Sequence, residues 1–133
     1  YGQAKDPVNQ TGMVAHNVVT GELVLTGPDA LTEDMPVLDV RTVGEYAAGH
    51  MPNSLNIPHT QLRDRLDEVR TWVETNVGDQ PFVVMCAAGV RSWIGYRIVR
   101  HAGFNVTMLS GGIQTLRAWL GEKAEAVLVK GEG

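Results

Sequence analysis

Short apolar runs and amphipathic segments alternate along most of this chain. Runs rich in large and β-branched apolar residues predict strands over residues 23–25, 37–40, 54–58, 82–85 and 106–109. Between these runs, apolar residues recur at steps of three and four, which predicts helices joined to the strands by short connections. Repeated alternation of this kind is typical of an α/β domain with a mostly parallel central sheet flanked by helices.

Capping and turn residues show where the predicted helices begin and end. Thr42 and Glu45 have the spacing of a capping box, and we expect Gly49 to end that short helix in a left-handed conformation. A longer helix is predicted over residues 60–77 and ends before Gly78. Its apolar face is formed by Leu62, Leu66, Val69, Val73 and Val77. Two further helices are expected, one following the cysteine loop and one carrying Ile113, Leu116 and Leu120.

Length and charge narrow the class of protein. The chain has 133 residues, enough for one domain with a real core. It carries 15 acidic and 11 basic residues without a cluster of Lys and Arg, so a nucleic-acid partner is not expected. No apolar run is long enough to span a membrane, so we expect no membrane partner either.

The ends of the chain and its one cysteine give three further expectations. A single cysteine cannot form an internal disulfide, which favours a cytoplasmic location. The chain starts at Tyr1 rather than Met, which suggests a piece of a longer protein, with residues 1–21 a short helix or a linker. Residues 122–133 are expected to form a frayed C-terminal tail.

The strongest candidate for chemistry is Cys86, which lies where the strand at residues 82–85 ends and a helical pattern begins. In open α/β sheets, ligands bind at the carboxyl ends of the strands. The unpaired amides and the dipole of the following helix favour the thiolate over the thiol, so we expect a lowered pKa. The small residues Ala87, Ala88 and Gly89, followed by Val90, let several amides converge on an anion, and Arg91 adds a positive charge.

Two chemistries use a cysteine in such an anion cradle. One is phosphoryl transfer through a phosphocysteine, and the other is transfer of a sulfane sulfur through a persulfide. Only Ala87 to Val90 separate Cys86 from Arg91, whereas the tyrosine and dual-specificity phosphatases have a longer loop, so the spacing favours sulfur. Two alternatives stay open: a structural cysteine that packs as a small hydrophobe, and a fold used for binding or regulation without catalysis.

Several motifs in this order resemble the rhodanese-like sulfurtransferase domains over about residues 22–121. The cysteine loop resembles their active loop, and Asp39-Val40-Arg41, Glu45-Tyr46, Gly49-His50-Met51-Pro52 and Leu109-Ser110-Gly111-Gly112 resemble their other signatures. The resemblance implies that Cys86 carries a persulfide, that the amides of residues 87–91 bind its sulfur, and that Asp39 and Arg41 support the loop. It implies a small donor, a persulfide, polysulfide or thiosulfate, and a thiol acceptor.

Two details refine this resemblance. Ala87 stands where thiosulfate sulfurtransferases often have a basic residue, which argues against thiosulfate as the natural donor. Residues 4–15 resemble the end of the reductase portion of FAD-dependent coenzyme A-disulfide reductases, some of which carry a C-terminal rhodanese domain. The resemblance implies a flavin reductase as fused or separate partner, with FAD and NAD(P)H bound there and no cofactor in this segment.

The remaining polar and aromatic residues have a structural and a functional interpretation. Asp39 and Arg41 suit a structural ion pair as well as loop support, and Glu45 is expected to be a helix cap rather than a catalytic acid. His50 is expected to satisfy a turn, and Trp93 to lie at the pocket mouth beside a packed Tyr96. Arg97 and Arg100 suit a solvated helix face or the steering of an anionic donor. The other histidines have no metal-ligand spacing: His16, His59 and His101.

Overall fold

A six-stranded sheet forms the centre of the molecule. The computed structural model describes residues 19–20 and 23–131, and the predictions for the rest of residues 1–21 lie outside this part. The strands follow the order β2-β3-β7-β6-β4-β5, in which β2 (Val19–Thr20) is antiparallel to β3 (Leu23–Thr26) and all other pairs are parallel. The predicted mostly parallel α/β sheet is therefore confirmed, and β2 is a strand that the sequence did not predict.

The four remaining strands lie where the apolar runs placed them. They are β4 (Val37–Asp39), β5 (Ser54–Asn56), β6 (Phe82–Met85) and β7 (Val106–Leu109). All residues of β4 and β6 are buried, as expected of strands in the middle of a parallel sheet that is covered on both faces. Cys86 follows directly after β6, between the carboxyl ends of the two neighbouring strands.

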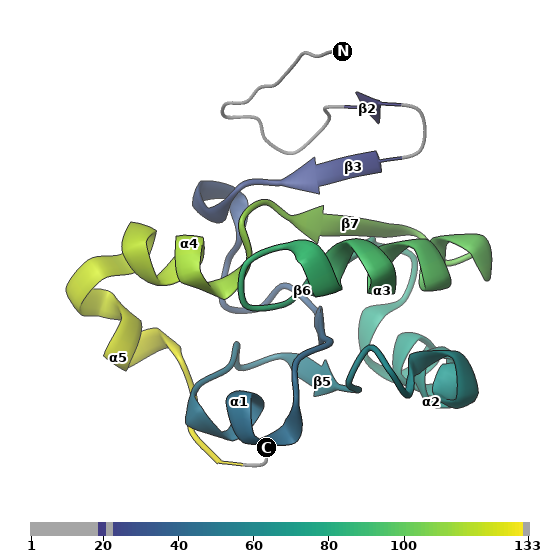
Figure 1. Cartoon of the computed structure of the whole chain (residues 1–133), viewed down its shortest axis with the longest axis horizontal. Helices are drawn as coiled ribbons and strands as arrows, with labels where there is room; N and C mark the ends of the chain where they lie inside the picture. Colours follow the sequence, from purple (N-terminus) through teal and green to yellow (C-terminus); the bar gives the residue numbers. More distant parts are fainter. Residues whose placement is uncertain (1–18, 21–22, 132–133) are drawn as a thin grey trace.

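Helices cover both faces of the sheet (Figure 1). One face packs against α2 (Leu66–Trp72) and α3 (Val90–His101), while the other packs against α4 (Gly112–Leu120) and α5 (Ala124–Val127). The helix predicted over residues 60–77 is one helical stretch in three parts. A 3₁₀ turn, η4 (Leu62–Arg65), precedes α2, and a π-helical turn, η5 (Val73–Val77), follows it.

The remaining helical elements are short. The predicted capping box is present at the start of α1 (Val43–Ala48), with Thr42 and Glu45 bonded to each other's amides. Gly49 ends α1, but its φ of 158° and ψ of 125° are not those of a left-handed cap, so that detail of the prediction is wrong. The 3₁₀ turns η3 (Pro28–Ala30) and η6 (Gly121–Lys123) complete the set.

The C-terminal segment is packed rather than frayed, which corrects the prediction made for residues 122–131. Ala124 and Leu128 are buried in the core beneath α4. Val129 forms an antiparallel bridge with His50, with backbone N···O distances of 2.9 Å and 2.8 Å. Because Gly131 N also donates to the carbonyl of Ala47, the segment ties α5 to the end of α1.

Candidate functional site

The loop after β6 folds back onto the sulfur of its own cysteine. Cys86 is 1% exposed, and its Sγ accepts a hydrogen bond from the Gly89 amide at 2.9 Å. Gly89 is the N-cap of α3 and has a φ of 113°, in the left-handed region that glycine tolerates. The structure therefore brings the predicted nucleophile and the start of α3 together, as the sequence predicted.

The first turn of α4 fixes the backbone of the loop from the other side. Ile113 N donates to the Cys86 carbonyl at 2.7 Å, and Gln114 N donates to the Ala87 carbonyl at 3.0 Å. In a trans peptide the N–H points opposite to the C=O, so the amides of Ala87 and Ala88 point away from α4. The carbonyls of Cys86 and Ala87 are thus occupied, and the amides of Ala87 and Ala88 lie on the side of the loop that faces away from α4.

Gly112 is the residue that allows α4 to approach the loop. A Cβ built at this position would lie 2.6 Å from the carbonyl oxygens of both Cys86 and Ala87, and the φ of Gly112 is +70°. Any larger residue would displace backbone atoms of the loop. The sequence pointed to Gly111 and Gly112 only as part of the motif at residues 109–112, so the role of Gly112 in positioning the thiol was missed.

Arg91, which was expected to add positive charge to the anion-binding loop, is held by a carboxylate. Arg91 donates from Nη1 and Nη2 to the two carboxylate oxygens of Glu45, at 2.6 Å and 2.8 Å. The bond to Arg91 lowers the pKa of Glu45 from 4.5 to about 2, and the same bond raises the pKa of Arg91. Glu45 is therefore a helix cap, as predicted, and also the counter-ion of the loop, which the sequence did not predict.

Asp39 and Arg41 form a buried ion pair that anchors α1. Arg41 Nη2 lies 2.7 Å from Asp39 Oδ2, and their side chains are 5% and 0% exposed. The same guanidinium donates to the carbonyls of Glu45 and Gly49, at the middle and end of α1. Asp39 and Arg41 are therefore a structural ion pair, which was one of the two expectations, and the pair positions the helix whose Glu45 holds Arg91. Support of the loop by the pair stays a prediction.

Trp93 lies one turn into α3 on its outer face. Its amide donates to the Gly89 carbonyl at 3.1 Å, and its side chain is 42% exposed. Its ring stacks on that of Tyr96 at 6.2 Å, with the Arg97 guanidinium 5.6 Å from the Trp93 ring centroid. Tyr96 is buried, as predicted, and its hydroxyl accepts from the Val24 amide. Trp93 is therefore an exposed side chain on a face that carries arginines, and its place at the mouth of the active-site pocket stays a prediction.

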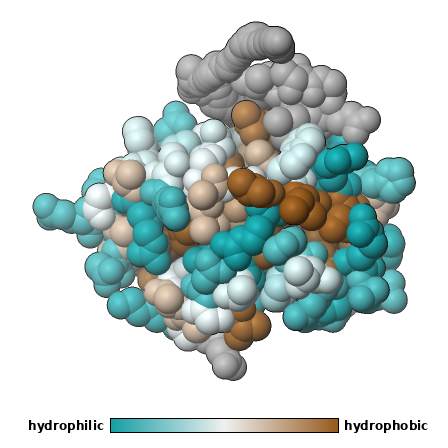
Figure 2. Space-filling view, viewed as in Figure 1, coloured by the Kyte–Doolittle hydropathy of each residue, from teal (hydrophilic) through white to brown (hydrophobic). Residues whose placement is uncertain are grey.

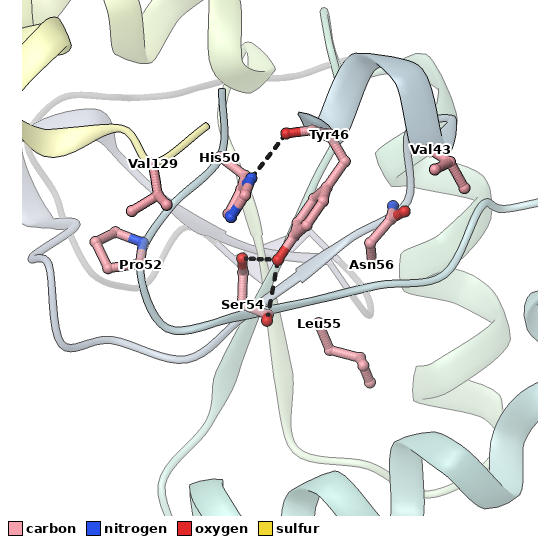
Figure 3. Close-up of a pocket in the computed structure, with 8 residues that line it drawn as sticks. All are labelled: Val43, Tyr46, His50, Pro52, Ser54, Leu55, Asn56 and Val129. Atoms are coloured by element: carbon pink, nitrogen blue, oxygen red, sulfur yellow. Dashed lines mark hydrogen bonds between the residues drawn. The ribbon is translucent and has the colours of Figure 1, made fainter. Parts of the chain in front are cut away.

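A cavity of about 390 Å³ lies beside α1 and β5, lined in part by His50, Tyr46 and Ser54 (Figure 3). The rings of Tyr46 and His50 stack at 3.7 Å, and His50 Nδ1 lies 2.7 Å from the Tyr46 carbonyl. The Tyr46 hydroxyl bonds to Ser54 Oγ at 2.8 Å. These contacts confirm that His50 satisfies a turn, and they explain why the signature segment at residues 49–52 packs beneath α1.

Residues 19–20 and 23–131 contain no group of three His, Cys, Asp or Glu side chains placed to hold a metal ion. The same part of the chain has no helix of the length and apolarity that crossing a membrane requires. Ser92, in the first turn of α3, is fully buried, and its Oγ has no hydrogen-bond partner there.

The fold and the loop define a class: an α/β domain that presents one thiol at the carboxyl edge of a parallel sheet. The sequence model of the rhodanese-like domain matches residues 27–118, most of the chain. The chain belongs to the rhodanese-like domain family.

Related proteins contain this domain in different settings. A tRNA uridine(34) hydroxylase of Escherichia coli O81 is 31% identical over 111 residues, which are 81% of this chain and 30% of that protein. An HTH-type transcriptional regulator, Rv0324, of Mycobacterium tuberculosis is 37% identical over 82 residues, 60% of this chain and 33% of the regulator. The chain thus spans about a third of the length of these curated relatives.

Two similar solved structures are reductases with a rhodanese domain. The NAD-dependent persulfide reductase of A. fulgidus is 35% identical with a TM-score of 0.57, over 71% of this chain and 16% of that one. The reduced CoADR-RHD of Bacillus anthracis is 31% identical with a TM-score of 0.55, over 65% of this chain and 14% of that one.

Proposed function

We propose that this domain is a sulfurtransferase that carries a sulfane sulfur as a persulfide on Cys86. The Cys86 thiolate attacks the outer sulfur of a donor, and the bond from that sulfur to the donor breaks, releasing the donor as its thiolate. An acceptor thiolate then attacks the outer sulfur of the persulfide and regenerates the Cys86 thiolate. The sulfur atom moves between thiolates in both steps, so no external oxidant or reductant is needed.

The observation that carries the proposal is the orientation of the loop around Sγ. The Gly89 amide already donates to the sulfur at 2.9 Å, while the carbonyls of Cys86 and Ala87 are bonded to α4. A ligand atom on Sγ would therefore meet N–H groups and the start of α3 rather than carbonyl oxygens. Such surroundings stabilise the anionic sulfur of a persulfide.

The size of the loop supports sulfur over phosphate. The Gly89 amide, three residues after the cysteine, contacts Sγ directly, so the loop closes tightly on one atom. A phosphoryl group has three further oxygens that each need a donor. The guanidinium of Arg91, the arginine that ends the loop, is committed to Glu45. We therefore expect no hydrolysis of aryl phosphates.

Intact mass spectrometry tests the proposal directly, because Cys86 is the single cysteine of the chain. After incubation with polysulfide or an alkyl persulfide, the protein should gain about 32 Da, one sulfur atom. The gain should be reversed by a thiol and absent from the Cys86→Ser variant. A wild-type chain that gains no sulfur from any donor would instead support the binding or regulatory alternative, and a Cys86→Ser chain that transfers sulfur normally would remove the thiol from the mechanism.

We further propose that the domain works with a flavin-dependent disulfide or persulfide reductase, fused or separate. Two reductases among the similar structures contain this fold as 14% and 16% of their chains, and residues 4–15 resemble the end of such a reductase portion. FAD and NAD(P)H would bind in that partner, with no cofactor in this domain. The test is NAD(P)H oxidation by the full gene product with a persulfide donor. A gene product that ends near these residues and activates no flavin reductase would contradict the proposal.

A further inference from the structure

The active loop offers almost no net charge to a donor. Residues 87–90 are uncharged, and the positive charge of Arg91 is compensated by the two carboxylate oxygens of Glu45 at 2.6 Å and 2.8 Å. A small dianion such as thiosulfate carries its charge within a bond or two of the sulfur to be transferred. Such a donor would have to place that charge where this loop has only backbone amides to meet it.

Uncompensated positive charge lies instead along the outer face of α3. A pocket of about 510 Å³ is lined there by Arg63 of η4 and by Arg97 and Arg100 of α3, with no acidic residue in its lining. Among the residues that the structure describes, none of these arginines takes part in an ion pair, whereas the nearby Arg65 is paired with Glu68. The positive charge of the pocket is therefore available to a ligand.

We call this pocket the α3 groove and define it by Arg63, Leu66, Trp93, Ile94, Arg97 and Arg100. Its walls are mixed: Ile94 is 41% exposed, and Figure 2 shows hydrophobic side chains over α3 with hydrophilic ones beside them. At a rise of about 1.5 Å per residue, Arg97 and Arg100 lie about 12 and 16 Å along the helix from Gly89. The groove thus begins one turn from the loop and leads away from it.

We propose that the α3 groove binds the distal anionic group of an extended thiol, whose persulfide sulfur reaches Cys86. This inference rests on the proposed sulfur transfer and names the substrate class for it. The apolar side chains of Leu66 and Ile94 suit the uncharged stem of such a molecule, and the arginines suit a phosphate or another polyanion at its end. The anionic end of the donor and its sulfur would then bind about 12 to 16 Å apart, the distance along α3 from Gly89 to the two arginines.

A plain solvated helix face is the competing explanation for these arginines. Arginines on a solvated surface commonly pair with nearby acidic side chains, as Arg65 does with Glu68 at 2.7 Å. A purely solvated role gives them no reason to line one pocket together. Here three of them border one pocket together with an exposed tryptophan, and Arg97 is stacked over that ring. The arrangement pre-orders a guanidinium at the groove and so lowers the cost of binding an anion.

Persulfides that differ only in charge and length test the inference. The probes are persulfides of mercaptoethyl phosphate and mercaptodecyl phosphate, each compared with its alcohol. We expect the phosphate to speed persulfide formation on Cys86 about tenfold for the decyl donor, the effect of a few exposed ion pairs, and not for the ethyl donor. An effect that is absent, or equal at both lengths, would overturn the inference.

Two double variants with the same change in charge locate the effect. Arg97→Gln/Arg100→Gln should abolish the advantage of the decyl phosphate. Lys123→Gln/Lys130→Gln, whose lysines are exposed in the C-terminal segment, should retain it. Loading from the uncharged decyl donor should stay normal in both, which shows that each is folded and active. An equal loss in the two double variants would mean that only net charge matters, and would refute a site in the groove.

A binding measurement separates failure of this inference from failure of the proposed function. Inorganic tripolyphosphate, followed by calorimetry on the wild-type chain, should bind about tenfold more weakly after the two arginine substitutions. If no donor loads Cys86 but this dependence is found, the sulfur chemistry fails and the anion site stands. If uncharged donors load Cys86 but tripolyphosphate does not bind, the α3 groove is not an anion site.

Discussion

Two helices hold the cysteine loop, and they do so by different physical means. α4 uses backbone amides, with Ile113 N and Gln114 N bonded to loop carbonyls at 2.7 Å and 3.0 Å. α1 uses a side-chain ion pair, Glu45 with Arg91, whose side chains are 36% and 27% exposed. The backbone hydrogen bonds do not titrate and hold the loop at a fixed distance from α4. The ion pair, in contrast, is screened by solvent and depends on pH. We conclude that α4 fixes the shape of the loop and that α1 sets its charge.

The largest effect is expected where α1 itself is anchored. Asp39→Asn leaves the buried Arg41 without its counter-ion, which should lower the free energy of unfolding in urea by about 3 kcal/mol. Asp34→Asn, an exposed carboxylate, serves as the control and should change it by less than about 0.5 kcal/mol. If both variants are equally stable, Asp39 and Arg41 are not the anchor of the α1 side.

A smaller but more local effect is expected on the α4 side. Gly112→Ala places a Cβ against two loop carbonyls at 2.6 Å, in addition to the strain of a φ of +70°. We expect a loss of about 2–3 kcal/mol in unfolding free energy and a marked fall in the rate of persulfide formation.

Gly121→Ala is the matched control for Gly112→Ala. It also has a positive φ, +58°, but no atom lies within 4 Å of the added Cβ. Its ψ of −124° lies outside the left-handed helical region, so it should show the backbone strain alone, about 1–3 kcal/mol, with normal sulfur loading. Equal loading by the two variants would mean that the approach of α4 does not shape the loop.

A still smaller effect on stability is expected for the ion pair. Glu45→Gln keeps a capping residue at the same position and removes only the charge that compensates Arg91. The unfolding free energy should fall by about 0.5–1 kcal/mol, since both side chains are partly exposed and screened. Loading from thiosulfate should rise about threefold, because the guanidinium is released toward the loop. Loading from an uncharged persulfide should not rise, and if it rises equally, Glu45 does not set the charge of the loop.

The difference between the α1 side and the α4 side of the loop also explains which features could be predicted from the sequence. The strands, the capping box and the cysteine at the strand end follow from neighbouring residues, and they could be predicted. The pairing of Glu45 with Arg91 joins residues 46 positions apart and depends on where α1 is anchored. The closeness of Gly112 to the Cys86 carbonyl likewise depends on how α4 docks. Local patterns thus identified the thiol, but not the contacts that hold it.

The prediction of a frayed tail failed over residues 122–131 for the same reason. Ala124 and Leu128 form only one turn of apolar spacing, too little to predict a helix by itself. Their burial comes from the core under α4 and from the bridge between Val129 and His50. A short segment that is stabilised mainly by distant partners gives little signal in its own sequence.

The smallest predicted effect is the pH dependence of the ion pair. Arg91 lowers the pKa of Glu45 from 4.5 to about 2, so the folded state binds the proton less readily than the unfolded chain. The stability that Glu45 contributes is therefore complete above the unfolded value of 4.5 and is lost as the pH falls toward 2. The difference in unfolding free energy between wild type and Glu45→Gln should shrink steadily between these two values.

A difference that stays constant down to acid unfolding would show that the variant acts through packing, and a difference that grows would reverse the sign of the proposed contribution. Either result would mean that the α1 side of the loop does not differ from the α4 side by a titrating contact.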